Sequence, residues 1–330
     1  MEPAVTAPPP EEARSGLDQL GRRLLVPLGL GVLVGIGLVL TASPRQLLDS
    51  FRRFDLRLLP FVLTLSLVNY GLRFLRWEAY LRKLEVPLAR GKSLAVFLVG
   101  FLLSVTPGKA GELGKSWLVR ELGGGPALRV VPAVLAERVT DLLGVLLIIA
   151  CGAAAFPNGI WLSALLLTAV AVVVLLLTWK TGADFIFRLL AKLPVLGPRV
   201  PLLVDLFDRL RSLLSPGLLA AALGLSAVAW SAEGVGFWLV VREYAPRASL
   251  LAALFNYTGA TVVGSLSMLP GGLGAAEGSM AALLHAQGLG TADANLITLV
   301  VRGATLWFAV WLGLLALPFV AKWLAARKNV

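Results

Sequence analysis

Residues 99–116 read VGFLLSVTPGKAGELGKS, an apolar run broken by Thr-Pro-Gly at 106–108. Residues 249–288 have the same arrangement around the break PGGLG at 270–274. Each half of these regions holds about 12–20 residues, mostly too short to cross ~30 Å of hydrocarbon at ~1.5 Å per residue. Backbone groups freed at such a break are tolerated in a membrane only inside protein or beside a water-filled cavity. The sequence therefore predicts two re-entrant helical hairpins.

The rest of the chain is rich in apolar runs. Of its 330 residues, 58% are hydrophobic and 15% are charged, against about 45–50% and about 25% in soluble domains. Six runs are long enough to span a bilayer: 24–41, 58–78, 130–155, 160–180, 216–241 and 292–320. We predict an all-α polytopic membrane protein with about six full spans and two re-entrant hairpins. Residues 1–23 are predicted to be a disordered cytoplasmic tail, and 24–325 a single transmembrane domain.

The distribution of Lys and Arg predicts the orientation. Both residues are concentrated at 76–92, 180–211 and 322–328, whereas the loops at 156–159 and 286–291 have neither. Six spans and two hairpins that do not cross put the basic segments on one side, so both termini are predicted to be cytoplasmic. The net charge of +11 then suits anionic lipid at that face rather than nucleic acid. Four arginines after the first span are exceptions to this charge rule. They belong to an amphipathic segment that is predicted to lie on the outer surface: Arg45, Arg52, Arg53 and Arg57.

The two hairpin regions belong to an internal repeat. The motif PGKAGE at 107–112 recurs loosely as PGGLGAAE at 270–277. Arg138 follows Pro107 by 31 residues (138 − 107), and Arg302 follows Pro270 by 32 (302 − 270). The chain thus contains two units of span, broken hairpin and span, at about 58–155 and 216–320, in opposite orientations. Inverted repeats with discontinuous helices are typical of secondary transporters, whose site lies at the interface of the repeats.

Several charged residues are predicted to lie inside the membrane: Glu112, Lys115, Glu137, Arg138, Asp141, Glu277 and Arg302. An unpaired charge at the bilayer centre costs about 2.5–3.5 kcal/mol on insertion scales, so such a set requires pairing or a polar cavity. One interpretation is structural, with Arg138–Asp141 and Arg302–Glu277 ion pairs that fasten hairpins to spans. Arg73, Arg76 and Glu78, near the end of the second span, are interpreted as snorkelling to the surface.

The alternative interpretation is a binding site. The helix ends after the two breaks expose backbone amides, so we expect a phosphate to bind there, at Lys109, Arg302, Gly108, Gly271 and Gly272. The carboxylates predicted to contact an amine or to carry a coupling proton are Glu112, Glu137 and Glu277. Arg138 and Asp141 are predicted to organise the site. A phosphate beside an amine or a sugar describes a lipid headgroup and also a zwitterionic solute.

Motifs of soluble enzymes fail in this chain. Gly114-Lys115-Ser116 resembles the end of a phosphate-binding loop, but Lys109 stands where that loop requires glycine. His285 is the only histidine and Cys151 the only cysteine, which excludes His-pair metal sites and intrachain disulfides. We therefore expect no catalytic residues, no metal and no cofactor.

Four motifs together resemble one known family. They are Arg73-x-x-Arg76-Trp77, PGKxGE at 107–112, Glu137-Arg138-x-x-Asp141 and PGGxGxxE at 270–277. In this order, within about 25–325, the chain resembles the flippase-like family that includes the transmembrane domain of lysylphosphatidylglycerol synthase. The resemblance implies a multi-pass protein of the bacterial cytoplasmic membrane that moves lipids between leaflets.

The resemblance also bears on the substrate. In two-domain relatives a cytosolic synthetase after the last span makes the lipid, an aminoacylated phosphatidylglycerol. This sequence reaches only Val330, so we expect a stand-alone domain without the synthetase. In the family that the chain resembles, other stand-alone relatives are linked to isoprenoid-phosphate carriers or remain unassigned.

Three functions remain open. The first is flipping or scrambling of a phospholipid or a polyprenyl-phosphate-linked lipid through a cavity formed by the two hairpins. The second is secondary transport of a small zwitterionic or anionic solute. The third is a membrane-embedded transferase with a Glu or Asp base. The expected partners are the lipid substrate and anionic lipids at the cytoplasmic face, but no nucleic acid; a homo-oligomer with a second copy of the chain is left open.

Overall fold

The computed structural model describes residues 29–106, 111–193 and 197–328. The predicted tail at 1–23 and the predicted site residues Gly108 and Lys109 lie outside these ranges. Within them all regular structure is helical. The first repeat consists of α3 (Leu59–Lys83), α4 (Arg90–Ser104), α5 (Gly114–Glu121) and α6 (Ala127–Ala153). The second consists of α10 (Pro216–Arg242), α11 (Leu250–Leu266), α12 (Ala275–Ala286), α13 (Thr291–Arg302) and α14 (Phe308–Lys328).

Four of the described helices are long and apolar enough to cross a membrane: Leu56–Lys83, Gly159–Thr178, Pro216–Arg242 and Thr291–Arg327. A fifth span would need helix Gly29–Thr41 together with α2 (Pro44–Arg53), although a 96° bend separates the two. The sixth predicted span is α6. Its 27 residues give it the necessary length, but the three charged residues at 137, 138 and 141 make it less apolar. The protein is a polytopic helical membrane protein.

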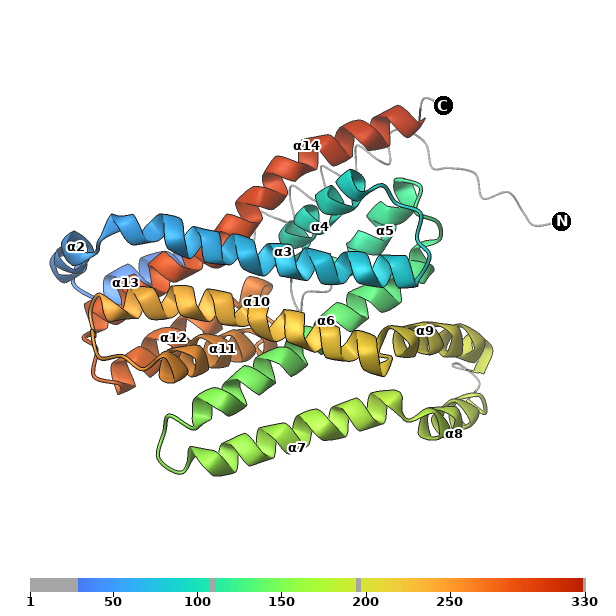
Figure 1. Ribbon diagram of the computed structural model, residues 1–330. Coiled ribbons are helices and arrows are strands. Elements are labelled where there is room, and N and C mark those ends of the chain that lie inside the picture. The colour runs from blue at the N-terminus through green and yellow to red at the C-terminus, as the bar shows by residue number, and fades with distance from the viewer. Residues whose placement is uncertain (1–28, 107–110, 194–196, 329–330) are drawn as a thin grey trace.

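The two hairpins enter the bundle from opposite ends (Figure 1). The first, α4 and α5, lies toward the end where α9 and the C-terminal end of α14 are found, and the second, α11 and α12, lies toward the end that carries α2. Each hairpin packs against the other repeat, because α4 packs on α14 and α11 packs on α6. The first helices of the repeats, α3 and α10, pack along each other. The inverted repeat predicted from the sequence is therefore visible in the arrangement of the helices.

Glycines shape the breaks of both hairpins. Gly272 has a φ of +68°, and a Cβ there would lie 3.0 Å from backbone atoms of Gly264 in α11. At the first break, the Gly111 amide donates to Thr106 Oγ1 at 2.8 Å, and a Cβ on Gly111 would be 2.6 Å from that oxygen. Larger residues would push the arms of each hairpin apart. A π-helical turn, Gly303–Trp307, joins α13 to α14 opposite the second break.

Helix α2 lies at the end of the bundle where the sequence predicts an amphipathic segment. Ser43 caps it by accepting from the Gln46 amide, and Arg53 Nη2 lies 2.6 Å from Asp293 Oδ1 at the start of α13. The Tyr244 hydroxyl donates to the Ser50 carbonyl at 2.9 Å. Burial raises the pKa of Tyr244 to about 12, which keeps this donor protonated. Arg53, one of the basic residues that did not fit the charge rule, thus has Asp293 as a structural partner.

The basic loop between α7 (Gly159–Thr178) and α10 contains two helices that the sequence analysis did not predict. They are α8 (Lys180–Leu190) and α9 (Val200–Leu213). Helix α9 packs on α6 and carries an exposed ion pair between Arg209 and Asp205, with Nε 2.9 Å from Oδ2. α8 and α9 lie at the same end of the bundle as the C-terminal end of α14 (Figure 1).

Candidate functional site

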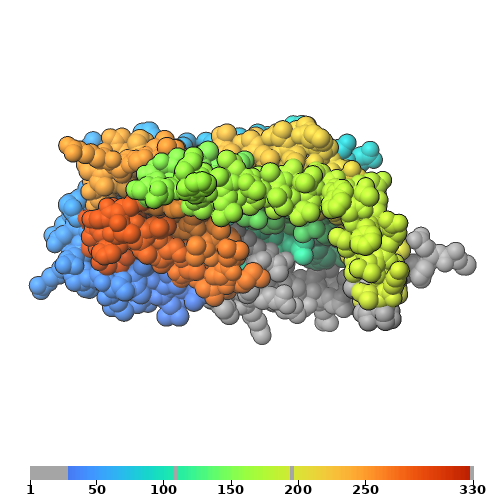
Figure 2. All heavy atoms as spheres, turned by 90° about the horizontal axis from the view of Figure 1, so that it is seen from below, coloured from blue at the N-terminus to red at the C-terminus, as the bar shows by residue number. Residues whose placement is uncertain are grey.

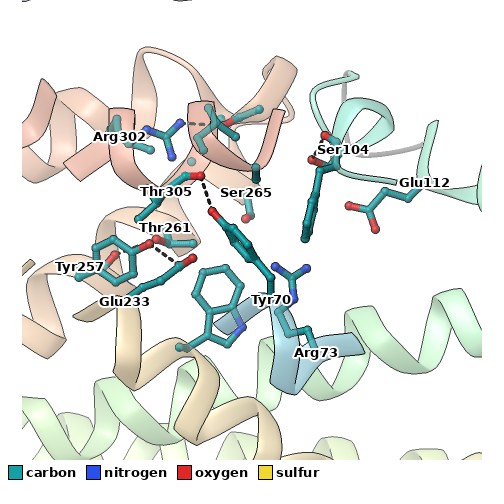
Figure 3. A pocket seen from close by; sticks show the side chains of 18 of the residues that line it. Tyr70, Arg73, Ser104, Glu112, Glu233, Tyr257, Thr261, Ser265, Arg302 and Thr305 are labelled. Carbon is teal, nitrogen blue, oxygen red and sulfur yellow. Dashed lines mark hydrogen bonds between the residues drawn. The ribbon is translucent and has the colours of Figure 1, made fainter. Parts of the chain in front are cut away.

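A polar cavity of about 100 Å³ lies where the two hairpins approach each other. Its walls come from α3, α4, α6, α10, α11, α12, α13 and α14, from both breaks and from the π-helical turn. Figure 3 shows side chains from these different elements converging on one space. The charged and phenolic residues that line it are Tyr70, Arg73, Glu112, Arg138, Glu233, Tyr257 and Arg302. The sequence predicts a site where the two breaks meet, and this cavity includes Gly271 and Gly272 of the second break; that the cavity is the site stays a prediction.

Asp141 on α6 is the centre of an ion-pair cluster beside the cavity. Its carboxylate is within 2.8 Å of Arg76, 3.2 Å of Arg138 and 3.6 Å of Arg73. It also accepts hydrogen bonds from Ser226 and Trp230 of α10, at 3.1 and 3.2 Å. The carboxylate therefore joins α3, α6 and α10.

The two repeats contain the same ion pair between a hairpin and the span that follows it. In the first, Arg138 Nη2 lies 3.2 Å from Glu112 Oε2. In the second, Arg302 Nε lies 2.5 Å from Glu277 Oε1. The Arg138–Asp141 and Arg302–Glu277 pairs of the structural interpretation are both present. Each repeat thus ties the second arm of its hairpin to its last span.

Glu277 has a second contact that bears on phosphate binding. Its Oε2 accepts from the Gly274 amide at 2.7 Å, so it caps the start of α12 with a negative charge. Arg302 also donates to the Gly271 carbonyl at 3.1 Å. Part of the positive helix end expected to hold phosphate is thus already occupied by a carboxylate. Gly271 and Gly272 still line the cavity.

Glu137 lies away from the cavity. It is fully buried and its Oε2 is 2.5 Å from Lys115 Nζ of α5. The ammonium group also lies over the ring of Trp77, 4.7 Å from its centre. Glu137 is therefore a buried partner of Lys115 in this structure, and its predicted contact with an amine or a coupling proton stays a prediction.

Arg73 and Arg76 correct the snorkelling interpretation. Arg76 has a side chain only 1% exposed, and Arg73 lines the cavity. The Arg73 guanidinium lies between the rings of Phe101 and Trp230, 5.6 and 5.5 Å from their centres. Its buried Nε has no hydrogen-bond partner among the described residues. Arg73 is thus an arginine whose donors are only partly used.

Glu233 is a cavity residue that the sequence analysis missed. It is buried on α10 and accepts a hydrogen bond at 2.6 Å from the Tyr257 hydroxyl of α11. In the described part of the chain no Lys or Arg nitrogen lies within 4.0 Å of its carboxylate. The signal was present in the sequence, because Glu233 is the only charged residue between Pro216 and Val241.

The structure thus separates the predicted site residues into groups. Those that line the cavity are Glu112, Arg138, Gly271, Gly272 and Arg302. Asp141 and Glu277 are not among the lining residues, but they form ion pairs with two that are, Arg138 and Arg302. Glu137 lies elsewhere, and Gly108 and Lys109 are outside the described residues. The residues that the structure adds to the cavity are Tyr70, Arg73, Glu233 and Tyr257.

Comparison with known proteins gives a consistent result. Residues 28–313 match the family model described as the lysylphosphatidylglycerol synthase TM region. Two UPF0104 membrane proteins of Methanothermobacter thermautotrophicus are similar over nearly their whole length. One is 23% identical, with 88% of this chain and 93% of the relative covered, and the other is 24% identical, with 86% and 90% covered. The chain belongs to the lysylphosphatidylglycerol synthase TM region family.

Proposed function

We propose that this protein translocates a lipid with an anionic headgroup between the leaflets of a membrane. The observation that carries the proposal is the cavity, in which arginines from three spans face the space between two broken hairpins. Arg73 and Arg302 are the groups proposed to bind the headgroup phosphate, since guanidinium groups bind phosphate oxygens in a planar, two-pronged manner. Arg138 and Asp141 are proposed to hold them in place.

The depth of the cavity supports this role. Arg302 lies roughly 17 Å along α13, and Arg73 roughly 21 Å along α3, at ~1.5 Å per residue. Both values correspond to the interior of a hydrocarbon layer about 30 Å thick. Retaining these charges there is costly, and a polar path for a headgroup gives a reason for it.

The size of the cavity and the shape of the surface favour a lipid over a whole small molecule. Sites for small ligands usually measure about 300–1,000 Å³, so a cavity of about 100 Å³ suits a phosphate group attached to tails that stay outside. Figure 2 shows a face hollowed between α7 with α8 (green to yellow-green) and the second hairpin (orange). We propose that lipid tails remain in this hollow while the headgroup crosses. The phospholipid and the polyprenyl-phosphate-linked lipid remain alternatives.

The protein is also proposed to act without covalent chemistry, in the cytoplasmic membrane, with both termini in the cytoplasm. The bacterial location implied by the resemblance stays a prediction. The basic α8–α9 segment would then face anionic lipids of the inner leaflet, which attract Lys and Arg. Labelling of single cysteines placed in α9 and in α2 of a Cys151→Ser background should modify the two sites from opposite sides of the membrane. Modification from the same side would contradict this topology.

Leaflet exchange in proteoliposomes tests the function. Lipids with a fluorescent tail and several headgroups are reconstituted, and a quencher restricted to the outer leaflet reports how fast the inner pool becomes accessible. We expect Arg73→Gln to slow exchange by roughly 10- to 100-fold, because a hydrogen bond to a charged group contributes about 1.5–3 kcal/mol. Arg52→Gln is the matched control, since the Arg52 side chain is 70% exposed on α2.

Two outcomes would contradict the proposal. One is a folded wild-type protein whose rate of leaflet exchange equals that of protein-free liposomes for every headgroup. The other is efficient competition by tailless glycerophosphate compounds together with their saturable uptake, which would favour a secondary transporter of a small anionic or zwitterionic solute. Equal rates of leaflet exchange for Arg73→Gln and Arg52→Gln would contradict a transport path through the cavity.

A further inference from the structure

Among the described residues, the buried charges around the cavity balance only when Glu233 is counted. The described arginines are Arg73, Arg76, Arg138 and Arg302, and the carboxylates within 4.0 Å of them are Glu112, Asp141 and Glu277. Four positive charges against three negative ones leave one positive charge. An ionised Glu233 makes the cluster neutral, and a protonated Glu233 leaves it with a charge of +1. The nearby Lys115–Glu137 pair is neutral by itself.

The surroundings of Glu233 allow either form. The groups that share its cavity are Tyr70 and Arg73 from α3, Glu112 and Arg138 from the first repeat, Tyr257 from α11 and Arg302 after the second hairpin. Asp141 lies behind Arg73. Glu233 accepts from the Tyr257 hydroxyl, and none of the arginines is within ion-pair distance. Its charge is therefore balanced only by the cluster as a whole.

An anionic ligand changes this balance. A phosphodiester that enters the cavity beside Arg73 and Arg302 adds one negative charge next to a buried carboxylate. Two like charges in a site removed from water strongly disfavour each other, and one of the groups then takes up a proton. A phosphodiester is too weak a base to do so near neutral pH, which leaves Glu233.

We propose that Glu233 binds one proton when the cavity binds a phosphodiester monoanion, so that the loaded site is electrically neutral. This inference rests on the proposed function and names its substrate class and its coupling ion. The proton comes from water and is returned when the headgroup leaves, so no covalent bond changes. Tyr257 is a positioning residue that holds the carboxyl group against α11. Transport of the anionic headgroup together with a proton is then electroneutral, and a pH gradient drives it.

Proton uptake on ligand binding tests the proposal directly. The full-length protein in a neutral detergent is titrated with dihexanoyl phosphatidylglycerol, whose phosphodiester carries one negative charge. Calorimetry in buffers of different ionisation enthalpy, from about pH 6 to about pH 9, gives the number of protons bound per ligand. By linkage, we expect uptake to approach about one proton per ligand where the empty protein holds Glu233 ionised, and affinity to fall there with rising pH.

Variants separate Glu233 from other titrating groups. Glu233→Gln imitates the protonated acid, so it should still bind the lipid but without proton uptake and without the pH dependence. Glu233→Asp keeps a titratable group and should restore the uptake. Glu121→Gln, at a partly exposed carboxylate paired with Arg120, should behave as wild type. Size-exclusion profiles verify that each variant is folded.

The results that would overturn the inference are distinct from failure of the proposed function. Binding without proton uptake at any pH, or uptake that persists in Glu233→Gln, overturns it. So does binding of dihexanoyl phosphatidylethanolamine, without proton uptake, that is lost in Glu233→Gln, because Glu233 would then bind the amine. Absence of phosphatidylglycerol binding also overturns the inference. The leaflet-exchange assay then tests the proposed translocation separately. Proton-linked binding without leaflet exchange would keep this inference and reject the proposed function.

Discussion

Replacing Asp141 with asparagine removes the charge at the centre of the ion-pair cluster while keeping the shape of the side chain. The variant leaves Arg76, Arg73 and Arg138 around a neutral amide. Arg138 keeps Glu112 as a partner at 3.2 Å, and Arg73 keeps its position between two aromatic rings. Arg76 loses the one carboxylate within 4.0 Å among the described residues, so most of the cost falls on this buried guanidinium.

The size of the effect follows from that assignment. Removing one partner of a buried ion pair costs about 3–5 kcal/mol, and the partners retained by Arg138 and Arg73 place Asp141→Asn near the lower end. We expect a loss of about 3 kcal/mol, which is roughly 100-fold in the unfolding equilibrium. Tryptophan fluorescence in mixed micelles of increasing sodium dodecyl sulfate content measures this free energy of unfolding.

A matched substitution serves as the control. Asp205→Asn breaks an exposed ion pair with Arg209 on α9, and exposed pairs of this spacing contribute about 0.3–0.5 kcal/mol. If Asp141→Asn lowers the free energy of unfolding no more than Asp205→Asn does, the cluster does not hold α3, α6 and α10 together. The double variant Arg76→Met/Asp141→Leu should recover part of the loss, because it removes the uncompensated charge. Failure to recover would assign the loss to the hydrogen bonds of Asp141 instead.

Two further substitutions test the hairpins. Gly272→Ala should destabilise the second hairpin, since its Cβ would lie 3.0 Å from backbone atoms of α11 at a φ of +68°; limited proteolysis should cut it faster. Gly278→Ala on α12, where a Cβ meets nothing within 4 Å, should leave proteolysis unchanged or slower, and equal cutting of both variants would contradict the assigned packing. Lys115→Met should lower the free energy of unfolding by about 3 kcal/mol, and adding Glu137→Leu should restore most of it. An additive loss in that double variant, measured by the same detergent titration, would show that the two residues do not act as a pair.

The hairpins and the repeat could be predicted because their signals are local. Proline and glycine break a helix wherever they fall, and short apolar arms cannot cross a bilayer. The helices α8 and α9 were missed because a basic loop with apolar residues gives a weaker signal than a membrane span. The predicted tail at 1–23 and residues 107–110 of the first break lie outside the described residues.

The contacts around the cavity could not be predicted from the sequence. Arg73 and Arg76 were assigned to a span end because that span was predicted to stop at 78, whereas α3 continues to Lys83 and places both arginines deeper. The contacts of Asp141 join residues far apart in the chain, which periodicity alone does not give. Glu233 could have been found, since a lone carboxylate in an apolar helix is unusual. Its partner Tyr257 belongs to another helix, and only the packing of α10 on α11 identifies it.

The packing of each hairpin on the other repeat has a consequence for how the protein is made. Helix α4 enters the membrane early in synthesis, but α14, against which it packs, is among the last segments to leave the ribosome. The surface that α4 presents to α14 is apolar and includes Leu102, so until α14 arrives this surface contacts lipid or the insertion machinery. A nascent chain arrested after α10 should therefore stay bound to membrane chaperones and be degraded, whereas the two halves made as separate polypeptides should rescue each other.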